Sequence, residues 1–96
     1  MTKEMELLRK MLDDNNIGWK DVSDTSSIYA ITRTHFNHRG YNWSVIHGYG
    51  TYGGYSSFEK DKGLLELMSD AVNGGEPLGY LTAQEAFSFV IGGDTK

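Results

Sequence analysis

The amino-acid sequence predicts an α+β fold in which a small antiparallel sheet of two or three strands packs against one N-terminal and two C-terminal helices. Three observations carry this prediction. Apolar residues recur at helical spacing near both ends, the central stretch is rich in β-branched and aromatic residues, and strands and helices do not alternate as a parallel sheet requires. A chain of 96 residues has the length of one domain, which we expect to span residues 1–96.

The first helix is expected at the start of the chain. Thr2 is in position to cap it, and acidic side chains in its first turn match the positive end of the helix dipole. Its apolar stripe consists of residues three or four positions apart, Met1, Met5, Leu8 and Leu12. The Asp-Asp-Asn-Asn run at 13–16 ends it, because short polar side chains compete for backbone hydrogen bonds. Trp19 is then predicted to enter the core, and residues 20–27 to form turns.

An antiparallel hairpin is expected in the middle of the chain. The segments 28–34 and 41–47 are rich in β-branched and aromatic residues, and Asn-His-Arg-Gly at 37–40 has the composition of a tight turn. Alternate residues of the second strand share one face, namely Tyr41, Trp43, Val45 and His47. A third strand at 51–55 is weakened by its glycines.

Two helices are expected after the hairpin. The first is predicted over 64–72 from apolar residues at helical spacing, Leu64, Leu67, Met68, Ala71 and Val72. The second begins at Thr82-Ala83-Gln84-Glu85, which has the pattern of a capping box. There the Thr82 hydroxyl accepts from the Glu85 amide, and the Glu85 carboxylate accepts from the Thr82 amide. This last helix is predicted to end at Gly92-Gly93.

The composition excludes several classes of protein. The chain has no cysteine, which excludes a disulfide framework, thiol catalysis and cysteine-ligated metal sites. No apolar segment approaches the roughly 20 residues that span a bilayer. The opening Met-Thr-Lys-Glu is charged and leads into an amphipathic stretch, unlike the apolar core of a signal peptide. We therefore expect a soluble, cytoplasmic protein that does not contact membranes.

Charge is unevenly distributed along the chain. The net charge is −4, yet residues 25–58 contain no Asp or Glu and hold Arg33, Arg39 and all three histidines. One interpretation is that strands and glycine-rich loops use few carboxylates. The other is a neutral-to-basic patch that meets an anionic or aromatic partner. Because the isoelectric point is near 5.2, nucleic-acid binding is not expected.

The loop after the second strand matches the GxGxxG string at Gly48–Gly53. In nucleotide sites such glycines let backbone amides approach phosphate, but there a helix follows at once, and here the next predicted helix begins about ten residues later. The same loop holds Tyr49, Tyr52 and Tyr55 among glycines and serines, a mixture typical of protein-binding loops. Alternatively, some of these rings cover the small core of the sheet.

Neither metal binding nor catalysis is indicated. His35 and His38 are spaced as a chelating pair, but no acidic ligand lies nearby in the sequence and no helical HExxH motif is present. None of the serines stands in a nucleophile-elbow context. We expect no enzyme activity, no cofactor and no metal.

The opening Thr-Lys-Glu-Met-Glu-Leu-Leu-Arg-Lys-Met-Leu, the Tyr-Gly-rich loop and the short helix–hairpin–helix–helix plan resemble small uncharacterised proteins of bacterial phages and prophages. The plan and the acidic balance are also similar to those of some phage inhibitors of CRISPR nucleases. Those inhibitors often mimic nucleic acid with dense carboxylates. The acid-free centre of this chain departs from that pattern, so the resemblance does not imply DNA mimicry.

We therefore predict a non-catalytic protein-binding module, in the phage interpretation an accessory or anti-defence protein that binds a host protein. The residues expected to contact the partner are Tyr49, Tyr52, Tyr55, Arg33, Arg39 and His47. The alternative is a small-ligand or nucleotide-binding domain that uses the Gly48–Gly53 loop. A third alternative is self-association through a sheet edge or an aromatic surface.

Overall fold

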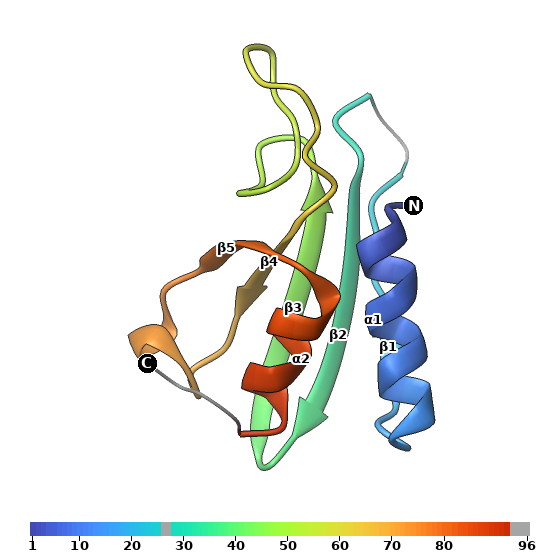
Figure 1. Ribbon diagram of the computed structural model, residues 1–96, viewed down its shortest axis with the longest axis vertical. Helices are drawn as coiled ribbons and strands as arrows, with labels where there is room; N and C mark the ends of the chain where they lie inside the picture. The colour runs from blue at the N-terminus through green and yellow to red at the C-terminus, as the bar shows by residue number, and fades with distance from the viewer. Residues whose placement is uncertain (26–27, 93–96) are drawn as a thin grey trace.

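A five-stranded antiparallel sheet with two helices forms the structure, a computed structural model that describes residues 1–25 and 28–92 (Figure 1). The strands follow one another in sequence order, so each pairs with the next along the chain. They are β1 (Trp19–Asp21), β2 (Ile31–His38), β3 (Tyr41–Gly48), β4 (Leu65–Met68) and β5 (Leu78–Leu81). Helix α1 (Lys3–Asp14) precedes the sheet, and α2 (Ala83–Val90) follows it.

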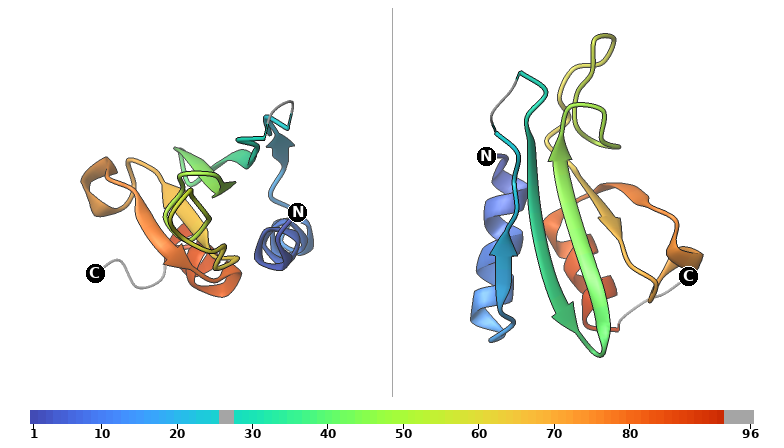
Figure 2. Two further views of the ribbon diagram at one scale, coloured as in Figure 1. Left: turned by 90° about the horizontal axis from the view of Figure 1, so that it is seen from above. Right: turned by 180° about the vertical axis from the view of Figure 1, so that it is seen from behind.

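Both helices cover the same face of the sheet. Seen from behind, the strands lie in front of α1 and α2 (Figure 2), and the two helices contact each other. The core fills the space between the helices and this face, and its larger members are Met5, Leu8, Leu12, Phe36, Trp43, Val45, Leu65, Leu67 and Val90. The opposite face of the sheet therefore carries no α-helix in the part of the chain that is described, and the short 3-10 helix η1 (Asn73–Gly75) follows β4.

The N-terminal helix forms where the apolar spacing predicts it. Met5, Leu8 and Leu12 are fully buried, whereas Met1, expected in the same stripe, is exposed. Thr2 occupies the N-cap position, but its hydroxyl makes no capping bond and donates to the carbonyl of Gly63 at 2.9 Å. That bond joins the start of α1 to the segment before β4.

The hairpin is confirmed, with strands longer than expected. β2 and β3 pair along their whole length, and Trp43, Val45 and His47 lie on the buried face as the alternation predicts. A two-residue turn joins them at Arg39 and Gly40, whose φ angles of 55° and 79° are both left-handed. This geometry matches the right-handed twist of the strands and favours glycine at the second position.

The helix predicted over 64–72 is wrong, because β4 occupies the first half of that segment. Leu65 and Leu67 are fully buried, while Met68, assigned to the apolar stripe, is 43% exposed. A short run of apolar residues fits a helical period and a strand period equally well. Here β4 pairs with β3 on one side and β5 on the other, and these two ladders decide in favour of the strand.

Two further differences concern short segments. Residues 51–55 form no strand. Tyr55 makes an isolated β-bridge to Tyr49. Conversely, β1 forms at the start of a segment predicted as turns, and Trp19 lies in it at the margin of the core rather than inside. The remaining expected turn residues 26–27 lie outside the described residues.

The last helix is confirmed together with its start signal. The hydroxyl of Thr82 accepts from the Glu85 amide at 3.2 Å, and the Glu85 carboxylate accepts from the Thr82 amide at 2.9 Å. After α2, Gly92 has a φ of 82°, which ends the helical path at the first residue of the predicted Gly92-Gly93 stop, and Gly93 lies outside the described residues. No helix of the described chain is long and apolar enough to cross a bilayer.

Candidate interaction surface

The glycine-rich loop between β3 and β4 is folded tightly on itself. A side chain on Gly54 would collide with the carbonyl of Gly48 and the hydroxyl of Thr51, and one on Gly48 would collide with the backbone of Ala30. The Thr51 hydroxyl also accepts from the Gly48 amide at 3.0 Å. Glycine is therefore needed at these two positions because other parts of the backbone come close to them. In the sequence motif, the glycines instead suggested a close approach of the backbone to a phosphate.

The amides of this loop donate inside the protein. Those of Gly50 and Tyr55 pair across the loop, at 2.8 Å and 3.3 Å to the carbonyls of Tyr55 and Gly48. The Tyr52 amide donates to the Glu66 carboxylate at 2.8 Å. The amides of Tyr49, Thr51 and Gly54 also donate to backbone carbonyls. Donors used in this way do not converge on a common point, as a phosphate cradle requires.

The three candidate tyrosines belong to two separate groups. Tyr49 lies between Tyr29 and Tyr55, with ring centroids 4.6 Å and 5.9 Å away, and both pairs meet edge to face. Its hydroxyl is 2.9 Å from that of Ser57. Tyr52 lies elsewhere, 6.3 Å from the ring of Tyr80. Tyr49 and Tyr55 are partly buried by these contacts, whereas Tyr52 is exposed.

His47 ties the end of β3 to the far part of the loop. It is buried, and its Nε2 lies 2.8 Å from Oδ1 of Asp61. Burial acts to raise the pKa of Asp61, but hydrogen bonds from His47 and from the Gly63 amide outweigh it, so this pKa lies below its ordinary value of 3.8. A cleft of about 330 Å³ lies beside the pair and includes Thr32 and Tyr55 in its lining.

This loop and the segment just before β2 lie at the same end of the molecule (Figure 1), and both carry exposed apolar side chains. Phe58 is 96% exposed, Ile28 82% and Tyr29 56%. Tyr49 links them, since it contacts Tyr29 by its ring and Ser57, the neighbour of Phe58, by its hydroxyl. We call Ile28, Tyr29, Tyr49, Tyr55 and Phe58 the aromatic end.

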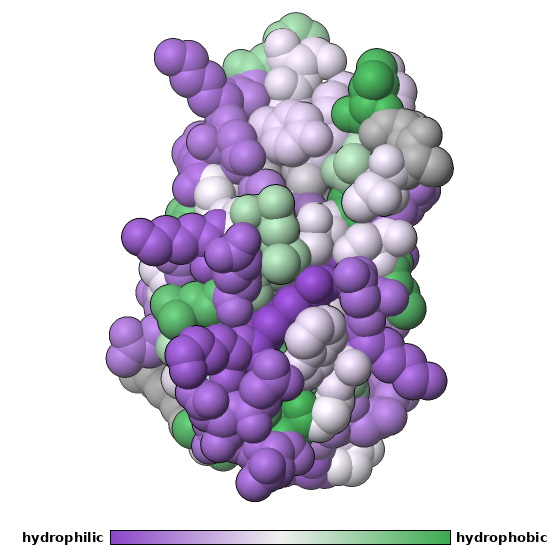
Figure 3. Space-filling view, turned by 90° about the vertical axis from the view of Figure 1, so that its right-hand side faces the viewer, coloured by the Kyte–Doolittle hydropathy of each residue, from purple (hydrophilic) through white to green (hydrophobic). Residues whose placement is uncertain are grey.

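The aromatic end contrasts with the side of the molecule that α1 covers. In Figure 3 hydrophilic side chains cover most of that side, and pale and hydrophobic surface gathers at its upper end. Full burial of one large apolar side chain contributes about 1.5–3 kcal/mol. Because Phe58 and Ile28 are exposed, their burial contributes almost nothing to the stability of the isolated chain. A partner that covers these side chains would gain this free energy of burial when the complex forms.

Neither candidate arginine belongs to the aromatic end. Arg39, in the hairpin turn, donates to the carbonyls of Val90 and Phe89 at 3.0 Å and 3.2 Å. These hydrogen bonds give partners to two carbonyl groups at the C-terminal end of α2. Its guanidinium also lies 5.8 Å from the Trp43 ring. Arg33 is in β2, where alternation places it on the helix-free face of the sheet. The six predicted contact residues therefore do not form one site.

Sequence reasoning missed Phe58, Ile28 and Tyr29. Phe58 stands alone in the polar run Ser-Ser-Phe-Glu-Lys-Asp-Lys, which is a signal for an exposed apolar residue. Ile28 and Tyr29 were assigned to a strand because their residue types favour one. They lie instead before β2, which begins at Ile31.

The histidines do not assemble a metal site. His35 lies in β2 with its Nε2 3.1 Å from the Ser44 hydroxyl, and His47 is paired with Asp61. Across residues 1–25 and 28–92, no group of three or more histidine, cysteine or acidic side chains is arranged to hold a metal ion.

Comparison with known proteins adds no family. The chain matches no protein-family model, and no curated protein or solved structure resembles it significantly.

Proposed function

We propose that this chain is a non-catalytic module that binds another protein through its aromatic end. The observation that carries the proposal is the exposure of Phe58, 96%, and of Ile28, 82%, on two segments that the edge-to-face contact of Tyr29 and Tyr49 joins. Aromatic anchors on a structured support are typical of protein–protein contact centres, because they add much apolar contact at little cost in conformational entropy.

The support beneath the anchors favours this function. Tyr49 packs against both Tyr29 and Tyr55, so it holds the two loops together and the three rings are not free. The His47–Asp61 contact fixes the other side of the loop at 2.8 Å. A partner would therefore meet a preorganised surface, which lowers the entropic cost of binding.

A phage-encoded accessory protein that occupies a host protein is one form of this function. It is supported by the opening segment and the Tyr-Gly-rich loop that carry the resemblance to phage and prophage proteins. In that form the partner is a bacterial protein with an apolar pocket that accepts Phe58.

The test is a photo-crosslinking capture from bacterial lysate, with and without nuclease. A photoreactive phenylalanine replaces Phe58 in one variant and Leu7, an exposed residue of α1, in the matched control. We expect one protein to be crosslinked from position 58 and not from position 7. The same protein should be lost from a tagged Phe58→Ser and Ile28→Ser double variant and retained by Leu7→Ser.

Three outcomes would overturn the proposal. The partner could remain bound to the double variant, in which case the aromatic end is not the contact. The crosslinked species could be a second copy of this chain, with a mass that depends on concentration, which would establish self-association instead. Recovery that disappears with nuclease would establish a nucleic-acid contact.

A further inference from the structure

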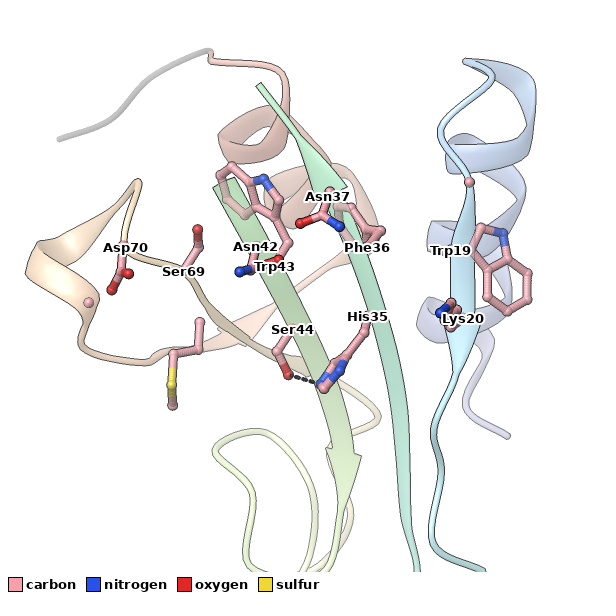
Figure 4. Close-up of a pocket in the computed structure, with 13 residues that line it drawn as sticks. Trp19, Lys20, His35, Phe36, Asn37, Asn42, Trp43, Ser44, Ser69 and Asp70 are labelled. Atoms are coloured by element: carbon pink, nitrogen blue, oxygen red, sulfur yellow. Dashed lines mark hydrogen bonds between the residues drawn. The ribbon is translucent and has the colours of Figure 1, made fainter. Parts of the chain in front are cut away.

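The helix-free face of the sheet carries a groove of about 740 Å³ (Figure 4). The strand register arranges its side chains in rows across the sheet. Lys20 on β1 is opposite His35 on β2, His35 is opposite Ser44 on β3, and Ser44 is opposite Met68 on β4. Beyond β4, Asp70 and Gly75 line the opposite margin. We call this surface the open-face groove.

Positive charge is concentrated on one side of the open-face groove. Lys20 and His35 are direct cross-strand neighbours in the lining, and Arg33, two residues from His35 on the same face, lies outside the lining. The carboxylate of the lining, Asp70, is on the opposite margin. The cross-strand partners on β3 are Ser44 and Ile46, which carry no charge. Asp21, the acidic residue of β1, is on the helix side and pairs with Arg9 at 3.4 Å.

Lys20 and Arg33 have no acidic partner among residues 1–25 and 28–92. Within the described residues neither Lys20 nor Arg33 forms an ion pair, whereas Lys10 on α1 is paired with Asp14 at 3.0 Å. Glu66, which shares the helix-free face, is buried and accepts from the Tyr52 amide at 2.8 Å. The positive side of the groove is therefore available to a carboxylate from outside the chain.

The rest of the lining suits a polypeptide. Asn37 and Asn42 are exposed and offer both donors and acceptors, which a peptide backbone requires. Met68, on the other side of His35 and Ser44, adds an exposed and adaptable apolar contact. Trp43 and Phe36 border the groove but are buried, so their rings are not presented for stacking with bases.

We propose that the open-face groove binds an extended acidic peptide segment of a partner protein, with its carboxylates against Lys20 and His35 in the groove and Arg33 beside it. Charge complementarity with Lys20 and Arg33 selects this occupant, and the net charge of −4 disfavours a nucleic acid. The groove and the aromatic end are separate surfaces, so this inference does not depend on the role of Phe58.

The test is an NMR titration of the whole chain with a short peptide of alternating glutamate and serine. We expect shifts confined to amides of β1, β2 and β3 around the groove, and weaker binding at higher salt. A Lys20→Gln and Arg33→Gln double variant should lose affinity about fivefold or more. Lys3→Gln with Lys10→Gln removes the same charge from α1 and should change the affinity by less than about twofold.

The outcomes that overturn the proposal are distinct from those of the crosslinking test. Equal binding of a glutamine–serine peptide would show that charge does not select the occupant. Shifts centred on other elements, or none at all, would remove the groove as a site. Tighter binding of a single-stranded thymidine oligonucleotide than of the acidic peptide would assign the surface to nucleic acid.

Discussion

The imidazole of His47 lies 2.8 Å from the carboxylate of Asp61, which joins the end of β3 to the loop that carries Phe58. Asp61 also accepts from the Gly63 amide at 2.8 Å, and Gly63 lies two residues before β4 begins at Leu65. The pair therefore closes the base of a long connection between two neighbouring strands. Its disruption should loosen the aromatic end before it affects the core.

The first prediction concerns the pH dependence of this contact. Because the pKa of Asp61 is lowered in the folded protein, the stabilisation is complete above the ordinary pKa of 3.8 and is lost as the pH falls through the lowered value. We expect the Tm of the native chain to fall more steeply below about pH 4 than that of Asp61→Asn. Thermal unfolding followed by circular dichroism over the acid range measures both curves, and parallel curves would contradict the prediction.

The second prediction concerns the main aromatic residue of the core. Trp43 is 1% exposed, stacks on Phe36 with the rings 7° from parallel, and donates to the His38 carbonyl at 3.0 Å. Trp43→Ala should lower the free energy of unfolding by about 3–5 kcal/mol. Denaturant unfolding measures this, with exposed Tyr41→Ala as the control. A loss below about 1 kcal/mol would mean that the site is not packed as described.

The third prediction separates a structural role of Arg39 from a binding role. Its guanidinium donates to two carbonyls at the end of α2, so Arg39→Ala should destabilise the fold by about 1–2 kcal/mol. Binding of the crosslinked partner, measured well below the Tm, should be unchanged. A variant with native stability and weakened binding would return Arg39 to the contact residues.

The fourth prediction compares two glycines. At Gly54 an added methyl group would collide with the Gly48 carbonyl, whereas at Gly18 nothing lies within 4 Å of its place. Gly54→Ala should therefore lower the free energy of unfolding by more than about 1 kcal/mol, and Gly18→Ala should stay within about 0.5 kcal/mol of the native chain. Equal unfolding midpoints in denaturant for the two variants would show that the loop adopts another conformation.

The sequence alone determined the elements whose signals are local. The apolar spacing of Met5, Leu8 and Leu12 predicted α1, and the capping box at Thr82 predicted the start of α2. The hairpin followed from β-branched residues on either side of a turn. In each case the residues that specify the element are neighbours along the chain, so their pattern is visible without the fold.

Tertiary structure decided the elements and sites that depend on distant partners. The apolar run at 64–68 forms a strand because β3 and β5 supply its hydrogen bonds. The spacing of apolar residues over five positions fits a helix and a strand equally well, so it does not reveal these partners. Arg39 caps a helix about fifty residues further on, and Tyr49 is covered by Tyr29 from another loop. Whether a polar or aromatic side chain is used internally or left for a partner depends on such contacts, which only the folded chain brings together.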